Sequence, residues 1–249
     1  MLTDIWTVCQ KEWRENLYQR DKIWQTLLNE LFSLAIFGIF FPLPLGKSGE
    51  DAAATFTLWY MVPSILVMVK VPDSFAGERE RHTLPTLLAT RLSDSAVVMG
   101  KISAAVIYGW TAAIIASLFG LIKVNLIDLK NAPIFYPLDS YLLGLGLSLL
   151  TAISIAALGI LVSLRAKTVK QALQSLALYY VAACLIPIIV LFVAEFLLPE
   201  TTNKNIASVL SGMNSTAFTL TGLLCFAIID LLLILFTLKR FKRNQLMLD

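Results

Sequence analysis

Six long apolar runs alternate with short polar segments along this chain of 249 residues. The runs are continuous rather than alternating, so they predict helices and not strands. Each run meets or approaches the length of about 20 apolar residues that a helix needs to cross the hydrocarbon core of a bilayer. The predicted membrane helices cover residues 27–45, 52–71, 96–122, 138–164, 172–198 and 217–238. The pattern therefore predicts an all-α polytopic membrane protein with six transmembrane helices, built as a single transmembrane domain over residues 1–249.

The first 25 residues precede the first apolar run and mix aromatic with charged positions. Bulky apolar residues recur at helical spacing on one face, namely Leu2, Ile5, Trp6, Cys9, Trp13, Leu17 and Trp24. The other face carries polar residues, namely Lys11, Glu12, Glu15, Gln19 and Lys22. This division predicts an N-terminal interfacial helix over residues 1–25, with its tryptophans at the membrane boundary. The alternative is that these residues form the solvated first turns of the first membrane helix.

The composition indicates that lipid is the solvent for most of the chain. Hydrophobic residues make up 57% of the sequence and charged residues 15%, against about 45–50% and about 25% in a soluble domain. There is one histidine, His82, and the three cysteines are far apart with no C-x-x-C pair. Such a set suggests neither a zinc site nor a disulfide framework. We expect no metal and no cofactor bound by this chain itself.

Lysine and arginine are distributed unevenly among the connections. If the N-terminus is cytoplasmic, sixteen of the 20 lie in the N-terminal segment, the second and fourth connections and the tail. The three outer loops then hold only Lys47, Lys123, Lys130 and Lys204. Cytoplasmic loops of membrane proteins are enriched in lysine and arginine. We therefore expect a multi-pass protein of the plasma (inner) membrane with both termini in the cytoplasm.

The longest charged passage between two apolar runs covers residues 77–101. It opens with four alternating charges, Glu78, Arg79, Glu80 and Arg81. Leucines then share one helical face, namely Leu84, Leu87, Leu88 and Leu92. Thr83 can cap such a helix, and Pro85 is tolerated in its first turn. An amphipathic helix of about ten residues is expected, either in a groove of a partner protein or on the lipid headgroups, and the residues alone leave both open.

Few charged residues lie inside the apolar runs. Asp230 is the deepest, in the middle of the last run. An isolated carboxylate there costs at least about 2.5 kcal/mol unless it is paired or hydrated, so a structural hydrogen bond and a place in the lining of a transport path are equal alternatives. Glu30 lies near the start of the first run and is expected to be a solvated helix end.

Small residues recur at intervals of four in the fourth apolar run, namely Gly144, Ser148, Ala152 and Ala156. Such a stripe lets another helix approach closely. The second helix can belong to the same subunit or to another copy, and the spacing does not decide between them.

A short segment, Gly46-Lys47-Ser48, looks like the end of a phosphate-binding loop. That loop needs a glycine five positions earlier, where this chain has Phe41, and it needs a preceding strand. We therefore expect no ATPase activity from this chain.

The charged passage resembles the signature of ABC-2 type transporter permeases. In that family a pattern E-R-E-x-G-T-L-x-x-L-L-x-T-P precedes a G-K pair at the start of the third helix. The matching residues here are 77–84, 87–90 and the pair Gly100-Lys101, and the family's N-terminal helix is matched by the K-E-W-R-E segment at residues 11–15. The chain departs from the pattern at three positions: His82 replaces the usual glycine, Pro85 stands where an acidic residue is common, and Arg91 replaces the common proline.

The resemblance implies a permease subunit that works as a homodimer or heterodimer in the lipid bilayer with two separate ABC ATPase subunits, which bind the ATP and magnesium. Residues 77–95 would be the cytoplasmic coupling element between helices 2 and 3, and residues 165–170 a second contact. The implied ATPase-coupling residues are Glu78, Arg79, Glu80, Arg81, Thr83, Leu84, Leu87, Leu88, Arg91, Leu92, Arg165, Lys167 and Lys170. Asp230 is the candidate for path lining.

Family members mostly export hydrophobic, amphipathic or polymeric substrates, and no nucleic-acid partner is expected. The sequence keeps rivals open: an ATP-independent carrier or channel, an intramembrane enzyme, and a membrane scaffold. A carrier usually has several intramembrane charges, whereas this chain has essentially one. An enzyme lacks support because the apolar runs contain no histidine and no pair of aspartates.

Overall fold

The computed structural model describes residues 1–18, 23–40, 50–127, 138–197 and 215–241, and all regular structure in these residues is helical. The elements are α1 (Leu2–Tyr18), α2 (Ile23–Phe40), α3 (Glu50–Lys70), the 3-10 turn η1 (Val71–Asp73), α4 (Ala76–Glu80), α5 (Leu84–Leu88), α6 (Asp94–Ile127), α7 (Leu138–Arg165), α8 (Val169–Leu197) and α10 (Ser215–Arg240). The predicted all-α class is confirmed for the described residues.

Four of these helices are long and apolar enough to cross a membrane. The candidate spans are Asp94–Lys123, Tyr141–Arg165, Val169–Ile186 and Leu220–Arg240. Helices α2 and α3 coincide with the first and second predicted membrane helices, except that residues 41–45 lie outside the described part. Their crossing of the membrane, and hence the count of six, stays a prediction.

Helix α7 lies at the centre of the bundle and packs against α3, α6, α8 and α10. Its small-residue stripe is inside the chain: Gly144, Ser148, Ala152 and Ala156 are all buried. Small side chains let the neighbouring helices approach the α7 backbone. The stripe therefore serves packing within the subunit.

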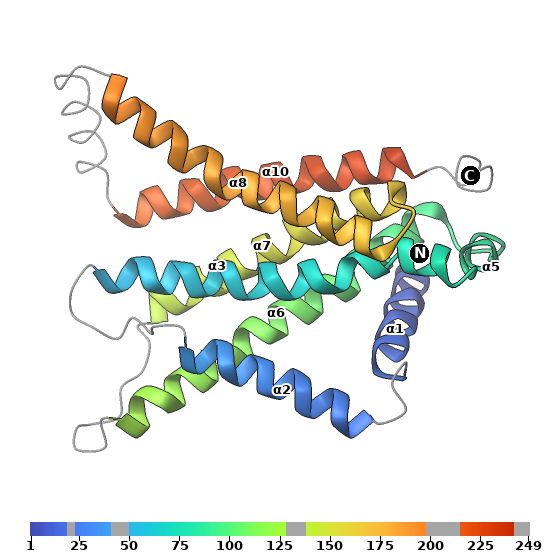
Figure 1. The fold of residues 1–249 in the computed structure, drawn as a ribbon, viewed down its shortest axis with the longest axis horizontal. Helices are drawn as coiled ribbons and strands as arrows, with labels where there is room; N and C mark the ends of the chain where they lie inside the picture. Colours follow the sequence, from blue (N-terminus) through green and yellow to red (C-terminus); the bar gives the residue numbers. More distant parts are fainter. Residues whose placement is uncertain (19–22, 41–49, 128–137, 198–214, 242–249) are drawn as a thin grey trace.

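Helix α1 is a separate element that runs across the ends of the long helices rather than along them (Figure 1). It packs mainly against α6 and points in a different direction from α2. Residues 1–18 are therefore not the first turns of α2. Val8 and Cys9 are buried against the bundle, whereas Trp6 is exposed. Trp13 is partly exposed and donates a hydrogen bond from Nε1 to the Ala104 carbonyl of α6 at 3.4 Å.

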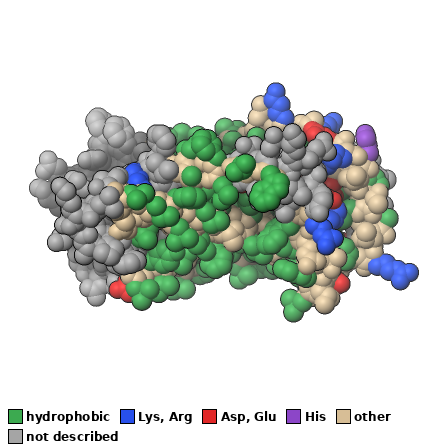
Figure 2. Space-filling view, turned by 90° about the horizontal axis from the view of Figure 1, so that it is seen from below, with side chains coloured by type: hydrophobic (Ala, Val, Ile, Leu, Met, Phe, Trp, Pro, Cys, Tyr) green, Lys and Arg blue, Asp and Glu red, His purple; other side chains and the backbone are tan. Residues whose placement is uncertain are grey.

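The middle of the bundle is covered by hydrophobic side chains, and charged side chains gather mostly toward the end where α4 and α5 lie (Figure 2). Helices α8 and α10 expose many large apolar residues, such as Leu178, Leu224 and Leu232. In water such a surface would be costly, whereas in a bilayer it is solvated by lipid tails.

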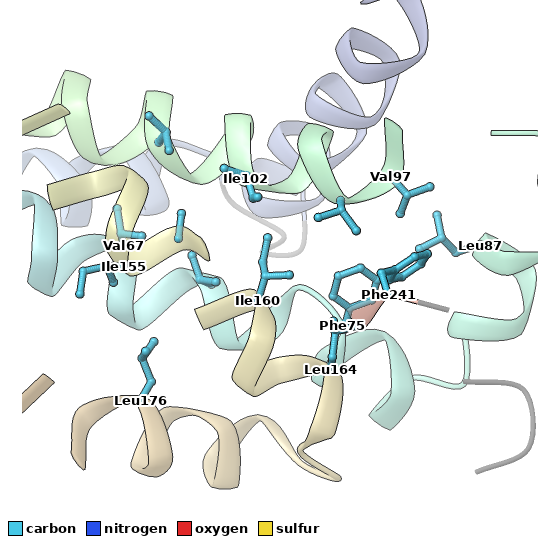
Figure 3. Close-up of a cluster of buried hydrophobic side chains, with 14 of the residues drawn as sticks. Val67, Phe75, Leu87, Val97, Ile102, Ile155, Ile160, Leu164, Leu176 and Phe241 are labelled. Carbon is cyan, nitrogen blue, oxygen red and sulfur yellow. The ribbon is translucent and has the colours of Figure 1, made fainter. Parts of the chain in front are cut away.

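The largest core cluster extends along α7 to the charged end of the bundle (Figure 3). It joins η1, α5, the start of α6, the second half of α7 and Phe241, which follows α10. Phe75 is fully buried there, with its ring centroid 5.5 Å from that of Phe241. This core holds the charged passage against the ends of the membrane helices.

Candidate functional site

The charged passage folds into a short chain of helices, α4 and α5, between η1 and α6. Ser163, near the end of α7, anchors its beginning. The Ser163 hydroxyl accepts hydrogen bonds from the backbone N–H groups of Phe75 (3.1 Å) and Ala76 (2.9 Å) and donates to the carbonyl of Pro72 (2.8 Å). These N–H groups at the start of α4 have no intrahelical partner. One buried hydroxyl therefore fixes α4 on α7.

Glu78 of α4 lies in a buried network of ion pairs. Its Oε1 atom is 3.1 Å from Lys101 Nζ of α6 and 2.9 Å from Lys11 Nζ of α1. Lys101 Nζ also lies 2.5 Å from Glu12 Oε1 of α1 and donates to the carbonyl of Ser74 at 2.7 Å. The side chains of Lys101 and Glu78 are only 1% and 3% exposed. These two buried groups are paired with each other, as burial of charge requires.

The network has a dry end and a wet end. Lys101 Nζ lies 4.9 Å from the centroid of the buried Phe75 ring, a cation–π contact. At the other end, Lys11 is 40% exposed and also pairs with Glu15 at 3.4 Å. Burial lowers the pKa of Lys11, but the hydrogen bond and charge of Glu78, with the charges of Glu15 and Glu12, outweigh it and raise that pKa. Lys11 therefore stays charged at neutral pH.

The carboxylates of Glu12, Glu15 and Glu78 offer oxygens within 4.8 Å of one another, a spacing that a metal ion could bridge. However, Lys11 and Lys101 already lie within ion-pair distance of these carboxylates. The ammonium groups supply the positive charge that a metal would otherwise bring, so the arrangement is an ion-pair network.

The Gly100-Lys101 pair has a direct structural reason. A Cβ on Gly100 would lie 2.6 Å from Val8 Cβ and 3.0 Å from the Ile5 carbonyl oxygen. Glycine is therefore what lets α1 approach α6 closely, and the next residue, Lys101, reaches the carboxylates of α1 and α4. Two residues of the polar face of α1, Lys11 and Glu12, bind α4 and α6. Their desolvation is compensated by these pairs.

Arg79 and Glu80 connect α4 to the turn between α7 and α8. The Arg79 guanidinium donates to the carbonyl oxygens of Leu164 (3.2 Å) and Ala166, at the end of α7. A Glu80 carboxylate oxygen accepts from the backbone N–H of Val169 (2.9 Å), the first residue of α8. Cations suit helix C-termini and anions suit helix N-termini. Residues 165–170, predicted as a second contact, are thus joined to α4, with Arg165, Lys167 and Lys170 exposed.

The predicted leucine face points into the protein. Leu84, Leu87 and Leu88 are 4%, 6% and 3% exposed and belong to the core cluster, and Figure 3 shows Leu87 beside Phe241 and Val97. Leu92 is half-buried against the same cluster. A partner groove therefore does not receive this face in the structure, and the side of α5 open to a partner is the opposite one. It carries exposed residues, namely Thr83, Pro85, Thr86, Ala89, Thr90 and Arg91.

Helix α5 is shorter than expected, with 5 residues. Pro85 does lie in its first turn, as predicted, but Thr83 makes no side-chain cap. The Thr83 hydroxyl instead donates to the carbonyl of Glu78 at 3.3 Å. Because leucine burial in the core stabilises α5, the helix needs neither length nor a cap.

His82 is the one non-glycine residue with a positive φ among the described residues, at 56°. This is the left-handed region that glycine adopts at little cost and that other L-residues adopt at about 1–2 kcal/mol. The observation explains why the resembling pattern has glycine here. His82 is exposed, so its side chain meets no steric obstacle beyond its own backbone.

We expect His82→Gly to leave the stability unchanged or raise it by up to about 1 kcal/mol, and His82→Val to lower it by about 1 kcal/mol or more. Thermal unfolding of the purified chain in detergent measures both. At Thr86, which lies in regular α5, the matched Thr86→Gly change should be destabilising. If His82→Gly is as harmful as Thr86→Gly, the left-handed conformation at residue 82 is wrong.

Asp230 lies on the bundle side of α10, 3% exposed, and one of its carboxylate oxygens accepts a hydrogen bond from the Ser154 hydroxyl of α7. Its other oxygen has no hydrogen-bond partner among the described residues. The geometry supports a structural link between α7 and α10, and path lining stays a prediction. Glu30 is not a merely solvated end: it pairs with Lys70 at 2.8 Å and accepts from the Tyr108 hydroxyl at 2.6 Å.

Comparison with known proteins assigns the family. The family model described as ABC-2 type transporter matches residues 3–186. The match covers α1 to the first part of α8, and so includes the ion-pair network and α4–α5. No curated protein sequence matches the chain. The family match and the apolar helices together make the chain a multi-pass membrane protein. Its matched domain is of the transporter-permease type, a kind of component that is generally not itself catalytic. The chain belongs to the ABC-2 type transporter family.

Proposed function

We propose that this chain is the permease subunit of an ATP-driven exporter and that residues 77–95 are its coupling element. In this proposal six helices cross the plasma membrane and both termini are cytoplasmic. Two permease subunits, identical or related, form the path, and separate ATPase subunits bind and hydrolyse ATP. The substrate is of a hydrophobic, amphipathic or polymeric class, as the family favours.

The observation that carries the proposal is the two-sided construction of α4 and α5. On the inner side, Glu78 is paired with α1 and α6, and Arg79 and Glu80 are hydrogen-bonded to the end of α7 and the start of α8. The leucines of α5 pack on the core that includes Phe241, directly after α10. On the outer side, the element offers only exposed polar and small residues. One surface is free for a partner while the other is fixed to the membrane helices.

This construction can transmit force. Close-packed interiors deform little and tend to move as units. An ATPase that displaces α5 would displace the ends of α1, α6, α7 and α8 with it, because the leucines of α5 are packed in the core and α4 is joined to these helices by short hydrogen bonds and ion pairs, of which Glu78–Lys101 is buried. ATP-driven closure of two ATPase subunits would thereby reorient the membrane helices and open the path between the permease subunits.

The two sets of coupling residues have different roles in this mechanism. Glu78, Arg79 and the leucines hold the element on the bundle. The exposed residues Thr83 and Arg91, together with Arg81, face the ATPase, and Lys167 and Lys170 supply the second contact. Arg81 forms an exposed ion pair with Asp73 at 3.0 Å. Exposed ion pairs contribute little stability, so Arg81 can leave Asp73 and bind the ATPase.

The proposal predicts that a P-loop ATPase is encoded beside the gene for this chain, and co-expression of the two proteins tests it. We expect both proteins to remain together through affinity purification by a tag on the chain and size exclusion, and the complex to hydrolyse ATP. A catalytically inactive ATPase variant is the control: it should co-purify without hydrolysis. Transport by the purified chain in vesicles without any ATPase would instead support a carrier or channel and contradict the proposal.

A further inference from the structure

A cavity of about 480 Å³ lies at the charged end of the bundle, and its lining contains no residue of α4 or α5. The end of α7, the beginning of α8 and the end of α10 form its walls. Part of the wall is apolar, with Leu158, Leu161, Val162 and Phe236, and part is polar, with Gln171, Ser175 and Tyr179. The lining thus has two sets of residues, apolar ones and ones that can form hydrogen bonds, which we call its apolar half and its polar half.

Two arginines complete the polar half, Arg165 at the end of α7 and Arg240 at the end of α10. Both are exposed, and neither has an ion-pair partner among the described residues. The Arg240 guanidinium lies 5.6 Å from the centroid of the Phe236 ring, which holds it at the cavity rim. Each arginine also stabilises the C-terminus of its own helix by its positive charge. This stabilisation does not require the two guanidinium groups to meet at one cavity.

The geometry points to a binding site for an anionic phospholipid in this cavity. The phosphate would bind Arg165 and Arg240, and the hydroxyls of Ser175 and Tyr179 and the amide of Gln171 offer hydrogen bonds to the rest of the headgroup. The acyl chains would follow Leu158, Leu161 and Phe236 to the exposed apolar surface of α8 and α10. Basic cavities between membrane helices at the cytoplasmic side recognise anionic headgroups in this way.

Two observations favour a lipid over a soluble anion or a protein partner. The apolar half of the cavity leads onto lipid-facing helix surfaces, where Leu178, Leu185 and Leu232 are exposed, so a ligand with acyl chains fills both halves. The bilayer also supplies such a ligand at high local concentration. In this proposal Arg165 binds lipid and not the ATPase. Lys167 and Lys170 are then the basic residues of the second ATPase contact.

Native mass spectrometry of the purified chain in detergent tests the site, with phosphatidylglycerol and phosphatidylcholine of the same acyl chains as probes. We expect one phosphatidylglycerol to bind at least about tenfold more tightly than phosphatidylcholine. Arg165→Gln/Arg240→Gln should weaken phosphatidylglycerol binding roughly 30-fold, because each arginine near the surface contributes about fivefold, and should leave phosphatidylcholine binding unchanged. Lys167→Gln/Lys170→Gln removes equal charge at residues that do not line the cavity, and should leave phosphatidylglycerol binding unchanged.

A second variant tests the cavity itself while keeping both arginines. Ser175→Trp fills the polar half and should weaken phosphatidylglycerol binding in the same way. Wild-type lipid affinity in Arg165→Gln/Arg240→Gln would overturn the assignment, as would displacement of the lipid by glycerol 3-phosphate at equal concentration. If Arg165→Gln/Arg240→Gln loses ATPase binding and keeps its lipid binding, the two arginines belong to the ATPase contact and the lipid site is wrong. Because the lipid readout uses the chain alone, its failure does not depend on the proposed function.

Discussion

Replacing Lys101 by methionine is expected to destabilise the chain by about 3–5 kcal/mol, because it removes the buried cation of Glu12 and Glu78 and leaves Glu78 with only the partly exposed Lys11. The Lys101 ammonium is paired with Glu12 and Glu78 and bonded to the Ser74 carbonyl. Methionine fills a similar volume and supplies none of these bonds. At about 2–4 °C per kcal/mol for a chain of this size, the unfolding temperature in detergent should fall by roughly 6–20 °C.

Lys11→Met is the matched control, since Lys11 pairs with the same Glu78 but is 40% exposed. Exposed pairs contribute about 0–1 kcal/mol, so its unfolding temperature should change by a few degrees at most. A double variant, Lys101→Met/Glu78→Gln, should be more stable than the sum of the single changes predicts, because the glutamine carries no charge to leave unpaired. Equal effects of Lys101→Met and Lys11→Met would show that the burial of the network is wrong.

The helices of this fold are predictable from the sequence because lipid imposes a simple rule. A chain in hydrocarbon must satisfy its backbone hydrogen bonds internally, so continuous apolar runs become helices wherever they occur. The predicted segments at 96–122 and 138–164 accordingly lie within α6 and α7. The intervals of four in α7 likewise predicted close packing, although only the structure shows that the neighbours are α3, α6, α8 and α10.

The position of the candidate site in the sequence was predictable, whereas the partners of its charged residues were not. The charged passage was found, but its chemistry depends on partners far along the chain: Lys11 and Glu78 are 67 positions apart, and Glu12 and Lys101 are 89 apart. No local periodicity encodes such a pair. The only signals were the K-E-W-R-E segment and the Gly100-Lys101 pair, each noted separately, whose convergence requires the packing of α1 on α6.

For Ser163 and for the leucine face too, the sequence does not reveal which part of the protein the side chains contact. Ser163 is one of several serine and threonine residues of α7, and the sequence gives no signal of its role at the start of α4. The leucines were recognised as one helical face, but periodicity shows only that a face is apolar, not which surface it meets. In this chain they meet the core with Phe75 and Phe241.

Leu88→Asp is therefore expected to cost about 5 kcal/mol or more, since the change removes a buried side chain and places a carboxylate in the core. The chain should fail to give a folded, monodisperse species in detergent. Thr86→Glu/Ala89→Glu, on the exposed side of the same short helix, should unfold at the wild-type temperature. If Leu88→Asp instead keeps wild-type stability, the leucine face is free and the original groove interpretation holds.

The folded Thr86→Glu/Ala89→Glu variant also allows the most direct test of the coupling proposal. Two added charges at the centre of a partner contact should weaken ATPase binding by about tenfold or more, whereas Thr3→Glu/Thr7→Glu, on the exposed side of α1, should not. The measurement is the affinity of the purified P-loop ATPase for each detergent-solubilised variant at equal amounts of folded chain. We predict a selective loss for Thr86→Glu/Ala89→Glu. Wild-type ATPase affinity in that variant would contradict the assignment of α5 as the coupling surface.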